Sequence, residues 1–164
     1  MKKDVFGLKF GLPPVYSAEC EVLILGSFPS VVSRGNFYYA NPRNRFWSML
    51  QSVFGETVPE DKEGRERFLL SHKIAVWDMV KECETAGSAD SSLKNLTREN
   101  INDIPELIRS AGIRKILCNG GKSHTLFKRY FKKEIDIPYY KMPSTSPANF
   151  KFDMEKWRLA FTNE

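Results

Sequence analysis

The chain of 164 residues has few of the residues that build metal centres or covalent cross-links. Its three cysteines, Cys20, Cys83 and Cys118, include no C-x-x-C pair. This argues against a disulfide framework, an iron–sulfur cluster and a four-cysteine zinc site. The two histidines, His72 and His124, are isolated, so the H-E-x-x-H helix of zinc hydrolases is missing as well.

Long apolar runs and a targeting segment are also missing. No stretch approaches the ~20 apolar residues that cross a bilayer, and Met1-Lys2-Lys3-Asp4 leads into no apolar signal region. We therefore expect a cytoplasmic protein with no membrane partner. A Walker loop, a G-x-S-x-G elbow, a paired-carboxylate motif and a Cys/His dyad are absent too. No standard catalytic motif therefore names a reaction.

What is present fits one globular domain over residues 1–164. Hydrophobic residues make up 41% of the chain and charged residues 27%, which excludes a disordered protein. The formal net charge of +5 permits a nucleic-acid partner without requiring one. Aromatic residues are unusually common, at 13% with 12 phenylalanines.

Two hydrophobic periods alternate along the chain. Short apolar runs with the length of strands occur at residues 21–25, 73–77, 113–118 and 137–141. Helical stripes occur at residues 46–54, 101–111, 126–131 and 154–161. Gly55 is a candidate C-cap, Asp153 a candidate N-cap, and Pro105 falls in a first helical turn. We expect the polar segment 83–95 to be a long loop. The pattern predicts an α/β fold, a three-layer α/β/α sandwich with a central four-stranded parallel sheet.

Small and polar residues follow each predicted strand. Ser27 follows the first strand, Asp78 the second, Asn119 the third and Ser144 the fourth. Ligands of open parallel sheets bind outside the carboxyl ends of the strands, so these segments should converge on one site.

The segment NFYYANPRNRFW at residues 36–47 interleaves aromatics with Arg43 and Arg45. Such a surface suits stacking on a base and holding a phosphate. Packing under the following helix is the other interpretation, and we favour it for Phe46 and Trp47. For Tyr38 and Tyr39 both interpretations stay open, and for Asn44 helix capping competes with a binding role.

The other strand-end residues also allow two interpretations. A carboxylate at Asp78 must find donors, either from a ligand or from a neighbouring loop. Asn119-Gly120-Gly121 fits a tight strand-to-helix turn or an anion site. The basic run from Lys128 to Lys133 fits a solvated helix face better than a DNA-binding stripe.

Four segments taken together resemble the uracil-DNA glycosylase superfamily. They are LILGSFPS (23–30), FYYANPRNRFW (37–47), KILCNGGKS (115–123) and MPSTSPAN (142–149). The chain is most similar to the deoxyinosine (hypoxanthine) DNA glycosylase branch, and VWDMVKECETAGSADSSL (76–93) strengthens that assignment. The resemblance implies a monofunctional enzyme without metal or cofactor. It would hydrolyse the N-glycosidic bond of hypoxanthine or uracil flipped out of DNA, leave an abasic site and act as a monomer.

The resemblance also implies roles for particular residues. Asn44 matches the catalytic Asn of the branch, and Tyr39, with Phe28, would stack on the extruded base. Asp78 would read the base edge, and Asn119 would stabilise the departing base. The proposed contacts to the DNA backbone are Ser27, Arg43, Arg45, Ser144 and Ser146. The loop expected to fill the vacated stack contains Pro143, Thr145, Pro147, Ala148 and Asn149.

Three positions depart from the superfamily pattern. Phe28 stands where mismatch-specific relatives carry a water-positioning Asn, Asn41 replaces a His before P-R-N, and Met142 replaces a His at the start of the last motif. Two alternatives stay open. The departures at Phe28 and Met142 would fit a catalytically inactive module that binds damaged DNA, and the modest net charge of +5 would allow a small nucleotide-binding α/β enzyme.

Overall fold

A four-stranded parallel sheet forms the centre of the computed structural model, which describes residues 8–84 and 96–162. The strands are β2 (Val22–Gly26), β3 (Ile74–Asp78), β5 (Lys115–Asn119) and β6 (Tyr139–Met142). Their order is β3-β2-β5-β6, and each neighbouring pair runs parallel. The predicted sheet is confirmed, with strand bounds shifted by one or two residues.

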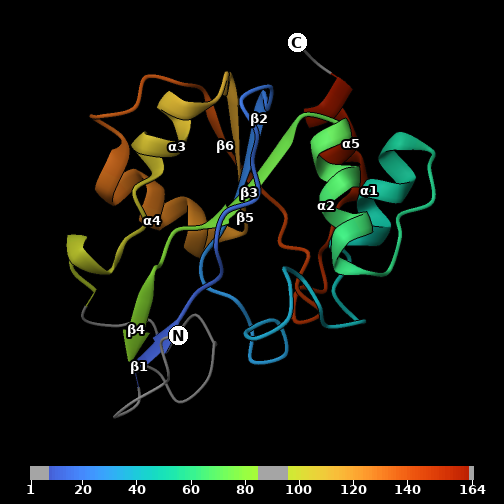
Figure 1. The fold of residues 1–164 in the computed structure, drawn as a ribbon, viewed down its shortest axis with the longest axis horizontal. Helices are drawn as coiled ribbons and strands as arrows, with labels where there is room; N and C mark the ends of the chain where they lie inside the picture. Colours follow the sequence, from blue (N-terminus) through green and yellow to red (C-terminus); the bar gives the residue numbers. More distant parts are fainter. Residues whose placement is uncertain (1–7, 85–95, 163–164) are drawn as a thin grey trace.

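Helices cover both faces of this sheet (Figure 1). On one side lie α3 (Ile104–Ser110) and α4 (Gly121–Phe131). On the other lie α1 (Phe46–Phe54), α2 (Lys62–Ser71) and α5 (Met154–Thr162). The molecule is therefore the three-layer α/β/α sandwich that the alternating periods predict.

The sequence of the central strand β2 is apolar without interruption because both of its faces are covered by helices. Leu23 and Leu25 pack into the cluster shared with α3 and α4, whereas Val22 and Ile24 pack into the cluster shared with α1, α2 and α5. All four side chains are buried. Because successive strand residues point to opposite faces, a strand between two helical layers needs apolar residues at every position.

Local signals correctly placed several helix ends. Gly55 ends α1 with a φ of +65°, and its backbone N–H donates to the carbonyl oxygen of Gln51. The carboxylate of Asp153 accepts a hydrogen bond from the backbone N–H of Glu155 at the start of α5, as an N-cap does. Pro105 lies in the first turn of α3.

Two expectations for the segment around residues 83–101 were wrong. Cys83 and Glu84 belong to β4 (Glu82–Glu84), which pairs antiparallel with β1 (Leu8–Phe10), and are not part of a loop. Ile101 forms an isolated bridge with Val80 and is not helical. Both pairings join residues far apart in sequence, which hydrophobic periodicity cannot reveal. The rest of the expected loop, residues 85–95, lies outside the described residues.

Helix α2 was not predicted, because its apolar residues are gathered in the last turn and form no regular stripe. Phe68 and Leu69 are buried there against the sheet, and most of the helix before them is polar. A capping signal was present, since the carboxylate of Asp61 accepts from the backbone N–H of Gly64 at 3.0 Å.

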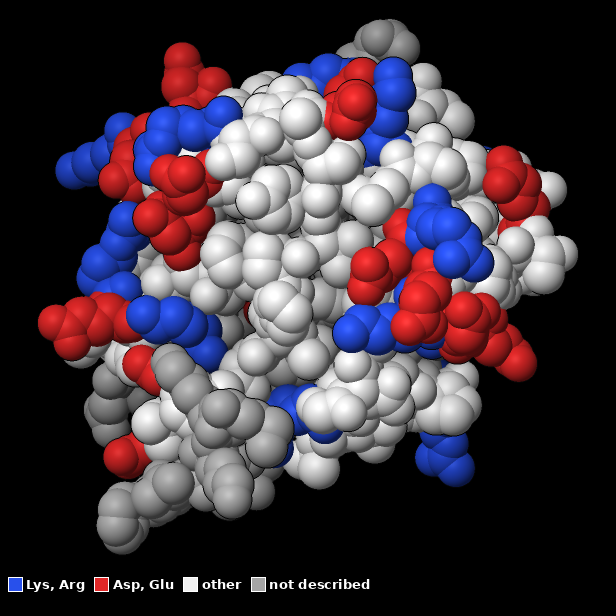
Figure 2. All heavy atoms as spheres, in the orientation of Figure 1, with Lys and Arg blue, Asp and Glu red and all other residues white. Residues whose placement is uncertain are grey.

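Charged side chains on the face shown in Figure 2 form mixed groups of both signs toward its edges, while its centre carries almost none. This face therefore has no basic stripe of the kind that binds DNA through charge alone. Within residues 8–84 and 96–162, no helix has the length and apolar character needed to cross a membrane.

Candidate active site at the strand ends

The segments that follow the parallel strands meet at two adjoining hollows. One has a volume of about 220 Å³, and Asp78 and Ser33 are among the residues that line it. The other has about 420 Å³ and reaches Gly26. Tyr39, Asn44 and Ser146 line both. We call the two hollows together the strand-end cleft.

The strand-end cleft brings together most of the residues that the sequence analysis proposed. Those that line it are Ser27, Tyr39, Asn44, Asp78, Asn119, Ser144, Thr145, Ser146, Pro147 and Ala148. Those that line neither hollow are Phe28, Arg43, Arg45, Pro143 and Asn149. The predicted convergence of the four strand ends therefore holds, and the remaining residues need separate accounts.

Asp78 is the last residue of β3 and the most deeply buried acid of the cleft. Its side chain is only 4% exposed, and its Oδ2 atom has no hydrogen-bond partner among the described residues. Burial raises the pKa of Asp78 from about 3.8 to about 7. Next to it, a Cβ atom on Gly26 would collide with Oδ1 of Asp78. Glycine at position 26 is therefore what makes room for the carboxylate.

Tyr39 adopts a left-handed backbone conformation with a φ of +53°, which is rare for a bulky residue. Its ring stacks on Phe46, with the centroids 3.9 Å apart and the planes at 18°. The hydroxyl is buried and has no hydrogen-bond partner among the described residues. Burial, together with the nearby charge of Asp78, raises the pKa of this hydroxyl, and the side chain of Asn119 lies near enough to lower it in part without forming a hydrogen bond of standard geometry. One face of the ring is covered by Phe46, so any base must use the other face or the hydroxyl.

Asn44 precedes α1 and combines both interpretations of its sequence position. Its Oδ1 accepts a hydrogen bond from the backbone N–H of Phe46, the first residue of α1, at 2.9 Å, although the N-cap position itself is Arg45. The same side chain lines both hollows of the strand-end cleft. Its Nδ2 group donates to no residue in the described part of the chain. The helix end thus holds the amide in place and leaves its donor group for a ligand.

The loop of residues 143–149 is held against the sheet from two directions. Asn119 donates from Nδ2 to the hydroxyl oxygen of Thr145 at 3.0 Å, and its Oδ1 accepts from the backbone N–H of Thr145 at 3.0 Å. Nη1 of Arg45 donates to the carbonyl oxygens of Ser146 and Asn149, at 3.1 and 3.0 Å. Asn119 and Arg45 therefore position this loop.

Hydrogen bonds within the loop shape it further. The hydroxyl oxygen of Ser144 accepts from the backbone N–H of Ser146 at 3.1 Å, and that of Ser146 accepts from Ala148 at 3.2 Å. Nε1 of Trp157 donates to the carbonyl oxygen of Pro143 at 2.8 Å. Each serine uses its hydroxyl oxygen as an acceptor here, so its O–H remains a donor for a ligand.

The structure does not bring Phe28 to the cleft as a base-stacking residue. Its side chain is 7% exposed and packs in the core cluster on the α3/α4 side, with the guanidinium of Arg34 5.5 Å from the ring centroid. An aromatic residue directly after a buried strand can point into the core or outward, and the sequence did not distinguish the two. Met142, the replacement for a His, is also buried in a core cluster.

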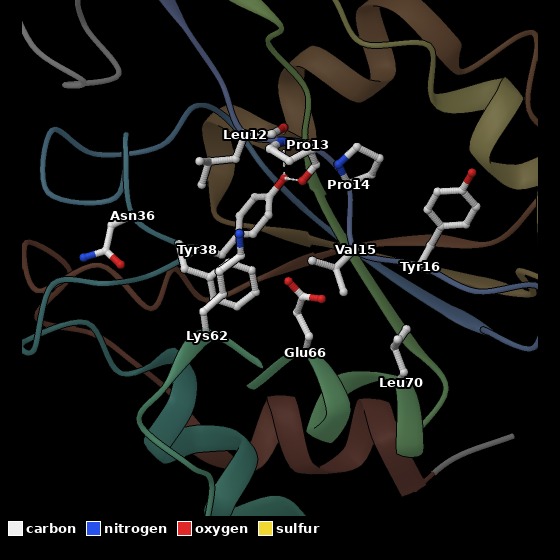
Figure 3. A pocket seen from close by; sticks show the side chains of 11 residues that line it. Leu12, Pro13, Pro14, Val15, Tyr16, Asn36, Tyr38, Lys62, Glu66 and Leu70 are labelled. Carbon is white, nitrogen blue, oxygen red and sulfur yellow. Dashed lines mark hydrogen bonds between the residues drawn. The ribbon is translucent and has the colours of Figure 1, made fainter. Parts of the chain in front are cut away.

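Tyr38 has a structural role at the edge of the cleft. Its hydroxyl donates to the carbonyl oxygen of Pro13 at 2.7 Å and lies 3.2 Å from that of Leu12 (Figure 3). The ring also borders a separate cavity of about 140 Å³ that contains Lys62 and Glu66 and lacks every proposed base-contacting residue. The packing interpretation also holds for Phe46 and Trp47, which are both buried.

Two hydroxyl residues of the cleft were not singled out from the sequence. Ser33 is buried, and its hydroxyl oxygen accepts from the backbone N–H of Ala40 at 3.1 Å. Ser30 donates from its hydroxyl to the same oxygen at 3.1 Å. These bonds tie the segment after β2 to the segment that carries Tyr39. The available signal was the excess of serine after the first strand.

Comparison with known proteins identifies the family. The model of the uracil DNA glycosylase superfamily matches residues 13–164. The chain belongs to that superfamily. Membership confirms the enzyme class expected from the motifs, a hydrolytic DNA glycosylase.

Two curated members of the superfamily carry the name hypoxanthine DNA glycosylase. The one from Methanosarcina barkeri is 38% identical over 118 residues, covering 70% of this chain and 73% of the relative. The one from Methanosarcina acetivorans is 30% identical over 159 residues, covering 94% and 98%. A solution NMR structure of a candidate uracil DNA glycosylase from Methanosarcina acetivorans matches with a TM-score of 0.79 at 32% identity, covering 94% of this chain and 96% of that one.

Proposed function

We propose that this glycosylase hydrolyses the bond between deoxyribose and hypoxanthine, with uracil as a second substrate, after the nucleotide has swung out of DNA. The convergence of Tyr39, Asn44 and Asp78 on one cleft supports this proposal most directly. The names of the two Methanosarcina relatives favour hypoxanthine. A base inside a duplex is out of reach of such a cleft, and extrusion is least costly for a base that pairs poorly.

Asn44 would orient the attacking water. The oxygen of that water forms a bond to C1′ of the sugar, the electron pair of the breaking C1′–N bond leaves with the base, and the proton that the water loses ends on the departing base anion. The helix end holds Oδ1 of Asn44, so its Nδ2 group can bind the water at a constant position. Asp78 would bind the edge of the base, and the strand-end amides would stabilise the departing anion. No lysine lines either hollow of the cleft in the described part of the chain, which favours hydrolysis over imine formation.

Different residues would hold the DNA around the extruded nucleotide. Ser144 and Ser146 have hydroxyl donors for phosphate oxygens, and Arg43 is exposed at the start of α1. The rigid loop of residues 143–149 would occupy the space that the base leaves. Phe150, directly after this loop, is 94% exposed and extends its apolar surface. Apolar side chains of this kind enter base stacks in proteins that kink DNA.

The test is single-turnover base release from duplexes that contain hypoxanthine, uracil, xanthine or a thymine mismatch, followed by alkali to reveal abasic sites. We expect Asn44→Ala to lower hypoxanthine release at least tenfold while duplex binding persists. Asn44→Ser retains a side-chain oxygen that can accept from the backbone N–H of Phe46 and should lose release to the same extent. Unchanged release in both variants would remove Asn44 from the mechanism.

The same assay separates the proposal from its alternatives. Lesion binding without any abasic product would indicate an inactive damage-binding module, which the burial of Phe28 and Met142 at two superfamily positions would then explain. Tight binding of free nucleotides together with weak, salt-insensitive binding of DNA would indicate a nucleotide-binding enzyme.

A further inference from the structure

Two buried polar atoms in the strand-end cleft lack a partner among the described residues. They are the hydroxyl oxygen of Tyr39 and Oδ2 of Asp78. Buried polar atoms of folded proteins are nearly always hydrogen-bonded, and an unpaired one lowers stability. Two such atoms in one cleft therefore point to a ligand that supplies the missing bonds.

Gly26 shows that the two groups border the same space. A Cβ atom built on Gly26 would lie 3.1 Å from the Tyr39 hydroxyl oxygen and would collide with the carboxylate of Asp78. The three residues come from different parts of the chain: Gly26 ends β2, Asp78 ends β3, and Tyr39 precedes α1. Register places Gly26 directly opposite Asp78. The tertiary fold, and not a local turn, thus brings the hydroxyl and the carboxylate together.

The two groups differ in what they offer to a ligand. A tyrosine hydroxyl has a hydrogen to donate, whereas the carboxylate of Asp78 only accepts once it is ionised, as it is at pH 8, where the binding assays below are run. A ligand that satisfies both needs an acceptor next to a donor. The lactam edge of a deaminated base has this arrangement, with the 6-oxygen beside N1–H in hypoxanthine and the 4-oxygen beside N3–H in uracil. Adenine and cytosine carry the reverse arrangement, with an amino donor beside a ring-nitrogen acceptor.

Building on the glycosylase function above, we propose that Tyr39 determines specificity through its hydroxyl, which donates to the carbonyl oxygen of the lactam edge. Asp78 accepts the adjacent N–H of the same edge. The ring face of Tyr39 that packs on Phe46 then serves to fix the hydroxyl in position. Adenine and cytosine are rejected, because each would place a donor against the hydroxyl hydrogen and an acceptor against the carboxylate.

The Tyr39 hydroxyl and the Asp78 carboxylate do not distinguish hypoxanthine and uracil from every other base. Guanine and thymine also carry a carbonyl oxygen beside a ring N–H, so the hydroxyl and the carboxylate accept their edges equally well. Their exclusion must come from other walls of the cleft that meet the 2-amino group or the 5-methyl group. Changing Tyr39 should therefore leave the discrimination between hypoxanthine and guanine unaltered.

The test compares hypoxanthine with unsubstituted purine, which has the same rings but lacks both the 6-oxygen and the hydrogen on N1. In single-turnover release from duplexes, Tyr39→Phe should lower hypoxanthine release about tenfold and change purine release by less than about twofold. Tyr130→Phe is the matched control, because Tyr130 lies on α4 away from the cleft and its hydroxyl donates to the carbonyl oxygen of Leu96. This control should leave both rates unchanged.

A second variant tests the acceptor side of the pair. Asp78→Asn introduces an amide donor, so its binding should shift toward adenine. Duplexes with a 2′-fluoro sugar, which resist hydrolysis, allow the binding of hypoxanthine and adenine to be compared directly. We expect the preference for hypoxanthine over adenine to fall at least tenfold. An unchanged preference would overturn the proposed role of the carboxylate.

Each outcome separates this inference from the function on which it rests. If the unmodified protein releases no base, the glycosylase proposal fails. If it releases hypoxanthine but Tyr39→Phe keeps the same ratio of hypoxanthine to purine release, only the inference fails. Thermal unfolding should show Tyr39→Phe to be at least as stable as the parent chain, because no hydrogen bond is lost. If Tyr39→Phe does not fold, the Tyr39 hydroxyl has a structural role in the protein, and the inference is overturned as well.

Discussion

At the scale of single residues, structural and functional interpretations of the same side chain proved compatible. Asn44 bonds to the first amide of α1 and still lines the cleft with its amide donor. The sequence presented capping and binding as alternatives, but a side chain with separate acceptor and donor atoms can do both. For Asn119 and Arg45 the observed hydrogen bonds are structural, because both side chains hold the loop of residues 143–149.

Asp78 makes stability depend on pH. Burial raises its pKa in the folded protein to about 7 from about 3.8, so between these values the folded state binds more protons than the unfolded state. The free energy of unfolding should therefore fall as the pH rises from about 4 to about 7. Asp78→Asn should remove this slope and raise the free energy of unfolding at pH 8 by up to about 4 kcal/mol.

Urea unfolding at pH 5 and pH 8 measures the effect. The control Asp136→Asn changes an exposed carboxylate and should leave both values within about 0.5 kcal/mol of the parent. An equal effect of Asp78→Asn at both pH values would show that the buried carboxylate does not titrate in this range.

At the scale of elements, the loop of residues 143–149 and the start of α1 form one unit. The backbone N–H of Arg45 donates to the carbonyl oxygen of Thr145 at 3.0 Å, and its guanidinium donates to two further carbonyl oxygens of the loop. Both of these bonds are donated by Nη1 of the guanidinium. The loop is thereby fixed beside Asn44, so that the proposed phosphate contacts and the reacting centre keep a constant spacing.

Removing this link should affect both the fold and the reaction. Arg45→Met retains the length of the side chain but loses its two hydrogen bonds to the loop. We expect the free energy of unfolding to fall by about 1–3 kcal/mol and base release to slow by at least threefold. Urea unfolding and single-turnover assays measure the two effects. Arg43→Met, at an exposed position, should leave stability unchanged; similar losses of stability in both variants would contradict the role of Arg45.

At the scale of the whole molecule, charge is distributed without a dominant basic surface on the face seen in Figure 2. The net charge of +5 is modest, so affinity for DNA should depend on a few contacts near the cleft. The basic run on α4 ends in exposed Lys132 and Lys133, far along the helix from the Gly121 end that borders the cleft.

The salt dependence of DNA affinity tests which basic residues contact the phosphates. Arg43→Ala should reduce the slope of log affinity against log salt by about 0.9, the value for one phosphate contact, without changing which base is released. Lys132→Ala should leave the slope unchanged if the α4 run is a solvated face. A larger effect of Lys132→Ala than of Arg43→Ala would place the DNA along α4.

The sequence alone determined the architecture and the place of the site. Continuous apolar runs specify strands that are buried on both faces, and parallel strands necessarily end at one edge, which is why Asp78, Asn119 and Ser144 could be grouped in advance. Tyr39 and Asn44 were added to this group by the resemblance to the superfamily. Only the tertiary structure decided what each side chain does there. The burial of Phe28, the engagement of Asn119 and Arg45 with the loop, and the meeting of the Tyr39 hydroxyl with Asp78 depend on contacts between distant segments, and no local period records such contacts.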